Sequence, residues 1–244
     1  MKLIAPPGYG AVVPFNKENH SILSVKEDQR LSFAKNLNAV FTTITEFVQC
    51  ARTYPIVFSK FKDSEEYIAM AVTGLATGEN RFIDEQGNWE PGTYVPAYVR
   101  RYPFCVVEIQ PDTDTAPQQL VCVDEAGLIE SEQSFFEADG EPTEGWQQFQ
   151  HFMQEYESSR ISTQVFTSKL AEHDLFEVFE AKAMHVSGQE YHMTNMYRVN
   201  EKKLKKLTAE VLRDFMNKNY MYFIYAHLMS LDNFQLLLDR EKTN

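Results

Sequence analysis

Residues 94 to 104 read Tyr94-Val-Pro-Ala-Tyr-Val-Arg-Arg-Tyr-Pro-Phe104. Four aromatic residues, two prolines and two adjacent arginines share these eleven positions. An ordinary surface loop does not need that mixture, and a simple core strand would not carry paired arginines. We therefore expect this double-arginine segment (residues 94–104) to hold the functional site, with the other elements arranged around it.

Arg100 and Arg101 are the first candidate ligand-binding residues. Guanidinium groups bind carboxylates and phosphates through paired hydrogen bonds, and they also stack on aromatic faces, which Tyr98 and Tyr102 could supply. In an extended segment neighbouring side chains point in opposite directions. One arginine would then face a pocket while the other forms ion pairs at the surface.

The alternative is an internal salt bridge from one of these arginines to Asp84, Asp124 or Glu125. Ion-pair networks also place arginines in such settings, and the pattern slightly favours this interpretation over ligand binding. In a binding site, Asp84 or Asp124 would orient the arginine. Trp89, one of only two tryptophans, completes the candidate ligand-binding residues.

The sequence on either side of this segment predicts that the protein belongs to the α+β class. Its N-terminal half is expected to be an antiparallel β meander, preceded by a short edge strand in Ala11–Phe15, because runs rich in β-branched and aromatic residues alternate with turns. The predicted strands of the meander are Pro55–Phe61, Tyr67–Thr73, Arg81–Asp84, Pro103–Ile109 and Leu120–Val123.

The C-terminal half is expected to be helical, with one extra β-hairpin formed by Phe176–Val186 and Tyr191–Val199. Threonine caps predict helices that start after Thr43, Thr143 and Thr208. In the second helix, an interruption near Ser158-Ser159 is left open. Tyr220–Leu238 is apolar nearly all round, which predicts a buried central helix. We expect a β-rich half (1–140) and a helix-rich half (141–244) to form one integrated domain with a shared core.

The composition excludes several function classes. The 244 residues carry a net charge of -12, and the pI is about 5.0. This argues against sequence-independent binding to nucleic acid, which needs a basic surface. Three cysteines within apolar runs predict buried, reduced thiols. With no signal-peptide core and no span-length apolar run, we expect a cytoplasmic protein, and export without a cleaved signal stays open.

The sequence contains only weak candidates for catalytic residues. Asp124 and Glu125 could act as acid and base, assisted by His227 or His20, although neighbours on a strand face opposite sides. His227 is more simply a hydrogen-bonded core histidine, and His20 a turn or capping residue. No metal-ligand motif, nucleophile motif or glycine-rich phosphate loop occurs, so we expect no metal and no cofactor.

Several segments together resemble the bacterial SapC-like family, with a match from about residue 11 to 240. They are Val13-Pro14-Phe15-Asn16 with His20, Tyr54–Phe58, Gly74-Leu75 with Gly78-Glu79-Asn80, the double-arginine segment, and Ile224–Leu228. Phe41 and Asp232 stand where the family more often has proline and glycine. The resemblance implies a link to surface layers or nutrient uptake, but it supplies no catalytic residues. A peptide-transporter permease that shares the name spans the membrane several times and is a different protein.

Three hypotheses follow. The first is a non-catalytic accessory protein of a surface-layer or nutrient-uptake system, which binds a small anionic or polar ligand, or a protein partner, at the double-arginine segment. The second is an enzyme that modifies an amino acid, peptide or sugar with a carboxylate as acid or base. The third is a structural interaction protein. An open cleft at Arg100, Asp124 and Tyr98 would favour the first two, and fully paired, buried arginines would favour the third.

Overall fold

The computed structural model describes residues 3–27, 30–60, 64–109, 118–131, 134–184 and 188–240. The ends of two predicted strands, Phe61 and Val186, lie outside these ranges. Within them the strands form antiparallel sheets and the longer helices follow in the C-terminal half, so the predicted α+β class is confirmed.

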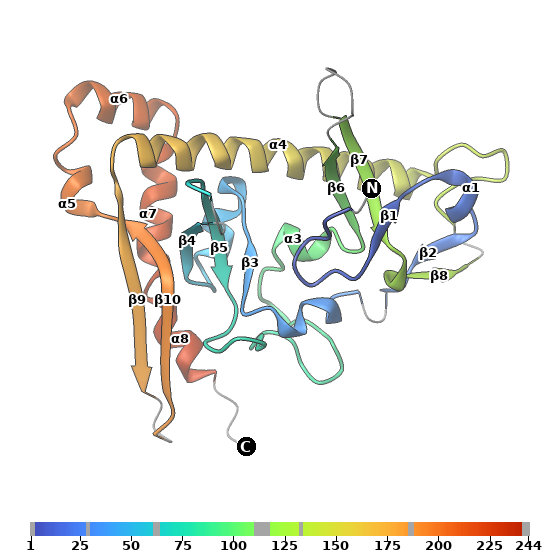
Figure 1. Cartoon of the computed structure of the whole chain (residues 1–244), viewed down its shortest axis with the longest axis horizontal. Coiled ribbons are helices and arrows are strands. Elements are labelled where there is room, and N and C mark those ends of the chain that lie inside the picture. The colour runs from blue at the N-terminus through green and yellow to red at the C-terminus, as the bar shows by residue number, and fades with distance from the viewer. Residues whose placement is uncertain are drawn as a thin grey trace.

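The larger sheet has five strands, in the order β3 (Ala39–Phe41), β5 (Tyr67–Val72), β4 (Ile56–Lys60), β10 (Glu190–Val199) and β9 (Phe176–Met184). The predicted C-terminal hairpin is present as β9 and β10, and it joins the N-terminal strands where Tyr197 lies opposite Phe58. The hairpin therefore extends a sheet that the first half of the chain begins (Figure 1).

A second sheet has three N-terminal strands, in the order β1 (Val12–Pro14), β7 (Gln118–Asp124) and β6 (Phe104–Ile109). The short strands β2 (Leu23–Val25) and β8 (Leu128–Glu130) pair separately. The N-terminal strands are thus divided between sheets. The strand predicted at Arg81–Asp84 is wrong, because this segment forms only a single bridge between Ile83 and Trp89.

Helix α4 (Glu144–Glu172) lies across both sheets (Figure 1). Trp146 and Met153, near its start, pack with the three-stranded sheet, whereas Phe166 and Leu170 pack in the main core. The predicted interruption at Ser158-Ser159 is wrong, because the helix runs through 29 residues. Hydroxyl groups of Ser162 and Thr163 donate to the carbonyls of Ser158 and Ser159, so these small polar residues are accommodated within it.

A substitution at the N-cap of α4 can measure how much the cap contributes to the stability of the protein. The Thr143 hydroxyl accepts a hydrogen bond from the Trp146 backbone N–H at 3.2 Å, as predicted. We expect Thr143→Ala to lower the free energy of unfolding by about 1 kcal/mol, measured by urea denaturation. Ser162→Ala, at an exposed position of the same helix, is the control and should change it by less than about 0.5 kcal/mol. Equal losses in both variants would contradict the capping role.

The remaining helices are short. They are α1 (Lys17–His20), α2 (Phe47–Cys50), α3 (Ala97–Arg100), α5 (Glu201–Leu204), α6 (Ala209–Asn217), α7 (Tyr220–Ser230) and α8 (Asn233–Asp239), with 3-10 turns at Ser32–Asn36, Ile44–Glu46 and Glu125–Gly127. No helix in the described ranges is long and apolar enough to cross a membrane.

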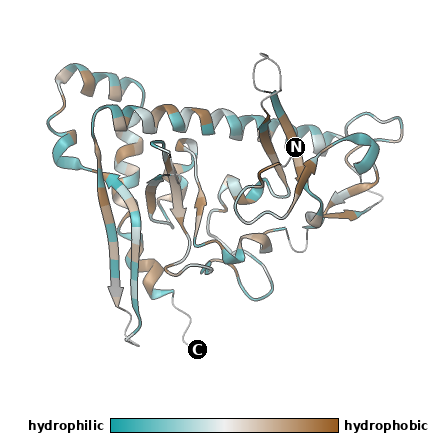
Figure 2. Cartoon of the chain, viewed as in Figure 1, coloured by the Kyte–Doolittle hydropathy of each residue, from teal (hydrophilic) through white to brown (hydrophobic). Residues whose placement is uncertain are grey.

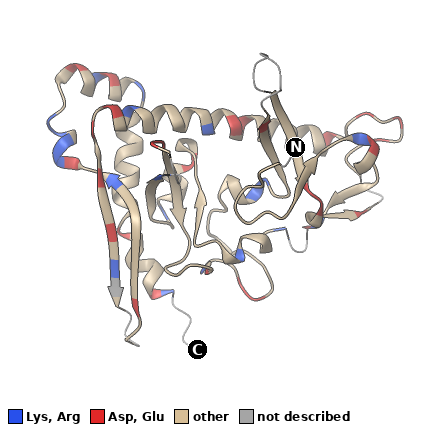
Figure 3. Ribbon diagram, in the orientation of Figure 1, with Lys and Arg blue, Asp and Glu red and all other residues tan. Residues whose placement is uncertain are grey.

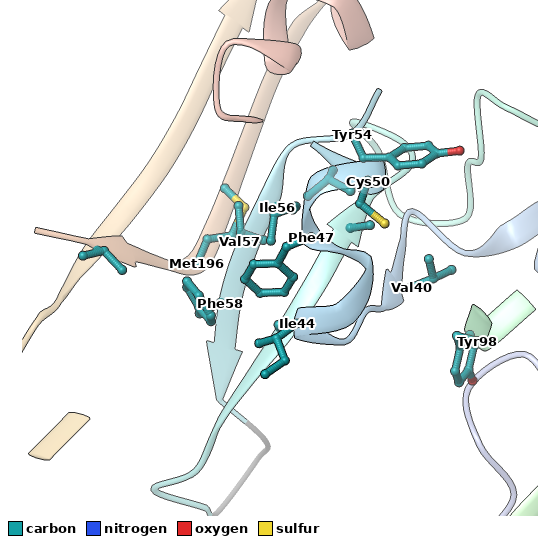
Figure 4. Close-up of a cluster of buried hydrophobic side chains, with 14 of the residues drawn as sticks. Val40, Ile44, Phe47, Cys50, Tyr54, Ile56, Val57, Phe58, Tyr98 and Met196 are labelled. Atoms are coloured by element: carbon teal, nitrogen blue, oxygen red, sulfur yellow. The ribbon is translucent and has the colours of Figure 1, made fainter. Parts of the chain in front are cut away.

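The main core lies between the five-stranded sheet and the helices packed on it. Figure 4 shows Ile56, Val57 and Phe58 of β4 beside Phe47 of α2 and Met196 of β10. The apolar residues in brown follow strands β3 to β5 in Figure 2. Cys50, Cys105 and Cys122 are buried free thiols, as their apolar surroundings predict. The core therefore joins residues from both halves of the chain.

The single buried helix predicted for Tyr220–Leu238 is wrong. The chain turns at Leu231-Asp232 and forms two helices, α7 and α8. The Asn233 amide donates to the carbonyls of Ala51 and Tyr54, which holds α8 against the end of α2. One side of α7 packs on the sheet and the other is exposed, with Met229 at 73% exposure.

Candidate functional site

The double-arginine segment contains a helical turn rather than the extended conformation expected at its arginines. Pro96 has β-region ψ and precedes α3, and after Arg101 a cis Tyr102–Pro103 peptide leads into β6. Successive residues in a helix are about 100° apart around its axis. Arg100 and Arg101 consequently still diverge, with Arg100 exposed and Arg101 only 6% exposed.

Glu46 anchors this segment from the end of a neighbouring 3-10 turn. One carboxylate oxygen accepts from the Ala97 backbone N–H at 2.6 Å and from the Tyr94 hydroxyl at 2.8 Å. The other accepts from the Thr43 backbone N–H at 3.3 Å and from its hydroxyl at 3.2 Å. The carboxylate is buried and completes the capping box expected at Thr43, and it also fixes the start of α3.

Arg101 lies in an aromatic cage that we define by Tyr9, Tyr98 and Tyr156. Its guanidinium carbon is 5.8, 4.8 and 4.7 Å from the centres of these three rings. Burial raises the pKa of Tyr156 to about 12 and that of Tyr98 further, so both phenols are neutral at pH 7. The cage holds the cation by ring electrons rather than by full negative charges.

The ionic partner of Arg101 is Glu157 on α4, at 3.5 Å, a residue not among the sequence candidates. The second oxygen of Glu157 accepts from Arg160 at 2.7 Å. The Nε of Arg101 is buried and has no hydrogen-bond partner among the described residues. A guanidinium has five donor hydrogens, and the one on Nε is therefore left unsatisfied in this arrangement.

A cleft of about 340 Å³ opens beside Arg101, between α4, strands β3 and β5, and strands β6 and β7. This volume lies in the range of small-molecule sites. Tyr156, Phe41 and Ile68 give it apolar walls. Its charged residues are of both signs: Arg101, Arg160, Glu66, Glu108 and Glu157. Figure 3 shows the acidic residues that α4 carries above the strands.

Arg100 lines a second, more open cleft on another side of Tyr156. Its Nε donates to the Val95 carbonyl and its Nη2 to the Tyr94 hydroxyl, both at 3.0 Å. The guanidinium also lies 4.9 Å from the centre of the Phe152 ring. Arg100 is therefore already paired within the chain, so Arg101 is the stronger candidate anchor.

The other candidate ligand-binding residues lie in different surroundings. Tyr102 stacks on Phe33, with ring centres 4.2 Å apart. Asp84 accepts from the backbone and side chain of Asn88 in an exposed turn. Trp89 is buried and donates to the Tyr54 hydroxyl at 3.1 Å. Of the six residues, Arg101 and Tyr98 are the two that meet at the cage.

The acid–base candidates occupy separate places. Asp124 is buried and accepts from the backbone N–H groups of Gly10 and Ala126. His20 lies 3.7 Å from the exposed Glu125. His227 is fully buried, where its Nδ1 donates to the Ile56 carbonyl at 2.8 Å and its Nε2 accepts from the Val199 N–H at 3.1 Å. In the described residues, no cluster of three His, Cys, Asp or Glu side chains could hold a metal ion.

A family model described as SapC matches residues 15–237 of the chain, which is nearly its whole length. No curated protein matches the chain, and no solved structure does. The match covers the Glu46 anchor, the double-arginine segment and the whole of α4. The residues that form the aromatic cage are included except for Tyr9.

Proposed function

We propose that this chain, which belongs to the SapC family, is a non-catalytic binding protein whose ligand is a small molecule with a carboxylate. The proposed anchor is Arg101, and the accessory role in a surface-layer or nutrient-uptake system rests on the family resemblance. One observation carries the proposal: Arg101, whose buried Nε has no hydrogen-bond partner in the described part of the chain, lines a cleft of ligand size. An unsatisfied buried donor costs about 1–3 kcal/mol, so a ligand acceptor that pairs with this guanidinium would be favoured.

The charges around the cleft indicate the ligand class. Arg101 and Arg160 can pair with a carboxylate, while Glu66 and Glu108 can pair with an ammonium group. Apolar walls between these ends suit a short aliphatic or aromatic body. An amino acid or a short peptide with both termini free has this arrangement, whereas a simple polyanion would meet three glutamates. We therefore propose a zwitterionic amino acid or dipeptide.

The proposal is tested by thermal unfolding in a panel of amino acids and dipeptides. A ligand at 100 times its Kd should add about 2.7 kcal/mol to the free energy of unfolding. For a chain of this size that raises Tm by roughly 5–10 °C. We expect the shift in the wild type and in Arg100→Ala, but not in Arg101→Met. Each Tm is compared with that of the same variant without ligand, which removes any loss of stability from the comparison.

Methyl esters of the stabilising compounds provide the matched ligand control, because they keep the size and ammonium group but lack the carboxylate. They should give no shift. A shift that survives in Arg101→Met, or that the esters reproduce, would remove Arg101 as the carboxylate anchor. A panel in which no compound shifts Tm would contradict the zwitterion proposal and direct attention to protein partners.

The enzyme alternative receives less support from the positions of its candidate residues. The two ring nitrogens of His227 are both engaged by backbone groups of β4 and β10. Asp124 is engaged by the backbone N–H groups of Gly10 and Ala126. Neither residue lines the Arg101 cleft, whose charged residues are Arg101, Arg160 and three glutamates. Binding is therefore the function that we propose for this cleft.

A further inference from the structure

Strand β9 lies at the end of the five-stranded sheet, and in the described part of the chain β10 is its hydrogen-bonded neighbour. It runs for nine residues, longer than any other strand of that sheet except β10. The hairpin extends well beyond β4 and forms an arm at the left of Figure 1. A long unpaired edge presents a row of backbone N–H and C=O groups that can pair with another strand.

One face of β9 is exposed and has a regular pattern. Val178, Glu180, Lys182 and Met184 alternate along the strand and point to the same side. Val178 and Met184 are 68% and 66% exposed, which is unusual for apolar residues at both ends of such a face. On the opposite face Phe179 packs against Phe234 of α8, with ring centres 5.7 Å apart. Along the strand these four residues are apolar, acidic, basic and apolar. If a second copy of the strand runs beside it in the opposite direction, acidic residues face basic ones and apolar residues face apolar ones.

We propose that β9 pairs with β9 of a second copy of this chain, antiparallel, around a two-fold axis perpendicular to the sheet at Ala181. This register places Glu180 opposite Lys182 of the other copy, and Val178 opposite its Met184. The symmetry produces each pair twice. Cross-strand pairs of opposite charge and of apolar residues each stabilise an antiparallel sheet by roughly 0.2–1 kcal/mol. Two five-stranded sheets become one continuous sheet.

Neighbouring registers lack this match. An axis at Glu180 sets two glutamates directly opposite, and an axis at Lys182 does the same with two lysines; like charges in these positions are destabilising. An axis at Phe179 places Val178 opposite Glu180. Of these registers, the one with its two-fold axis at Ala181 is therefore favoured by both charge and apolar contact. The interface is small, so the dimer should dissociate on dilution.

The test is sedimentation velocity of the full chain over a concentration series. We expect the wild type to change from monomer to dimer as concentration rises. Glu180→Lys and Lys182→Glu should each weaken the dimer at least tenfold, because each creates two like-charged pairs. The double exchange Glu180→Lys with Lys182→Glu should restore it, since opposite charges again face each other. Glu155→Lys, at an exposed position of α4, is the control and should leave the dimer unchanged.

A monomer at every concentration would overturn the proposal. So would a dimer that ignores both single substitutions, or a double exchange that restores nothing, because either result places the interface elsewhere. The monomer Tm of each variant is measured alongside, since Glu180 also contacts His192 at 3.0 Å within the chain.

Cysteine cross-linking provides a second, independent measurement of the axis. Residues directly opposite in an antiparallel pair have Cα atoms about 4.5–5.5 Å apart, a distance that a disulfide can bridge. Mild oxidation of Ala181→Cys should therefore yield a covalent dimer of twice 28.3 kDa. In Lys182→Cys the two new thiols would be offset along the strands by about 7 Å and should not cross-link. Cross-linking of Lys182→Cys but not of Ala181→Cys would exclude an axis at Ala181.

Discussion

Glu46→Ala is expected to lower the free energy of unfolding by about 4 kcal/mol, the largest loss from any single substitution considered. The buried carboxylate accepts four hydrogen bonds, from Thr43, Tyr94 and Ala97. Hydrogen bonds to a charged group contribute about 1.5–3 kcal/mol each, although losses within one network do not add. Alanine also leaves two backbone N–H groups without an acceptor. Urea denaturation measures the loss, and Tm should fall by roughly 8–16 °C.

Two further variants separate the carboxylate from its individual contacts. Tyr94→Phe removes one of the four hydrogen bonds and should cost about 1 kcal/mol. Glu155→Ala removes an exposed glutamate that pairs with His151 on α4, and its effect should be within about 0.5 kcal/mol of zero. A loss in Glu46→Ala no greater than that in Glu155→Ala would show that the start of α3 does not depend on this anchor.

The second large effect is a loss of stability in acid that depends on His227. Complete burial lowers the pKa of His227 from 6.5 to about 4. The unfolded chain therefore binds a proton between pH 6.5 and 4 that the folded chain does not. The free energy of unfolding falls as the pH is lowered through this window, by roughly 3 kcal/mol in total for this residue. The hydrogen-bond geometry acts in the same direction as burial, because a proton on Nε2 would face the Val199 N–H.

His227→Gln isolates this contribution from that of the carboxylates, which also titrate in acid. Glutamine can donate to the Ile56 carbonyl and accept from the Val199 N–H, but it does not titrate. Urea denaturation at a series of pH values should give a flatter curve for the variant between pH 6.5 and 4. The two curves should run parallel above pH 6.5. Parallel curves over the whole range would contradict a neutral His227 in the fold.

Local patterns predicted the elements well where a single short-range interaction determines them. The Thr43–Glu46 spacing predicts a capping box, and Thr143 and Thr208 cap α4 and α6. The C-terminal hairpin is predicted as well, and β9 and β10 form it. The interruption near Ser158-Ser159 is absent, because packing of α4 against both sheets outweighs the small helix penalty of two serines.

Long-range relations could not be predicted from spacing. Nothing local indicates that Glu46 accepts from Ala97, or that Glu157 is the partner of Arg101, because 51 and 56 residues separate these pairs. The apolar stretch Tyr220–Leu238 shows which residues avoid water on average, yet it cannot show that a turn at Leu231 leaves one side of α7 uncovered. Arg101 was a candidate from its residue type, whereas its cage requires Tyr9 and Tyr156 from distant segments.

The order of strands in the larger sheet has a consequence for synthesis on the ribosome. Strand β4 ends at Lys60, but its neighbour β10 begins only at Glu190, so about 130 residues must be translated before that edge can be covered. At roughly 5–20 residues per second this takes on the order of ten seconds. Throughout that interval the nascent chain carries an open hydrogen-bonding edge on β4 around Phe58, the residue that pairs with Tyr197 in the folded protein. An open edge is the kind of surface that chaperones shield.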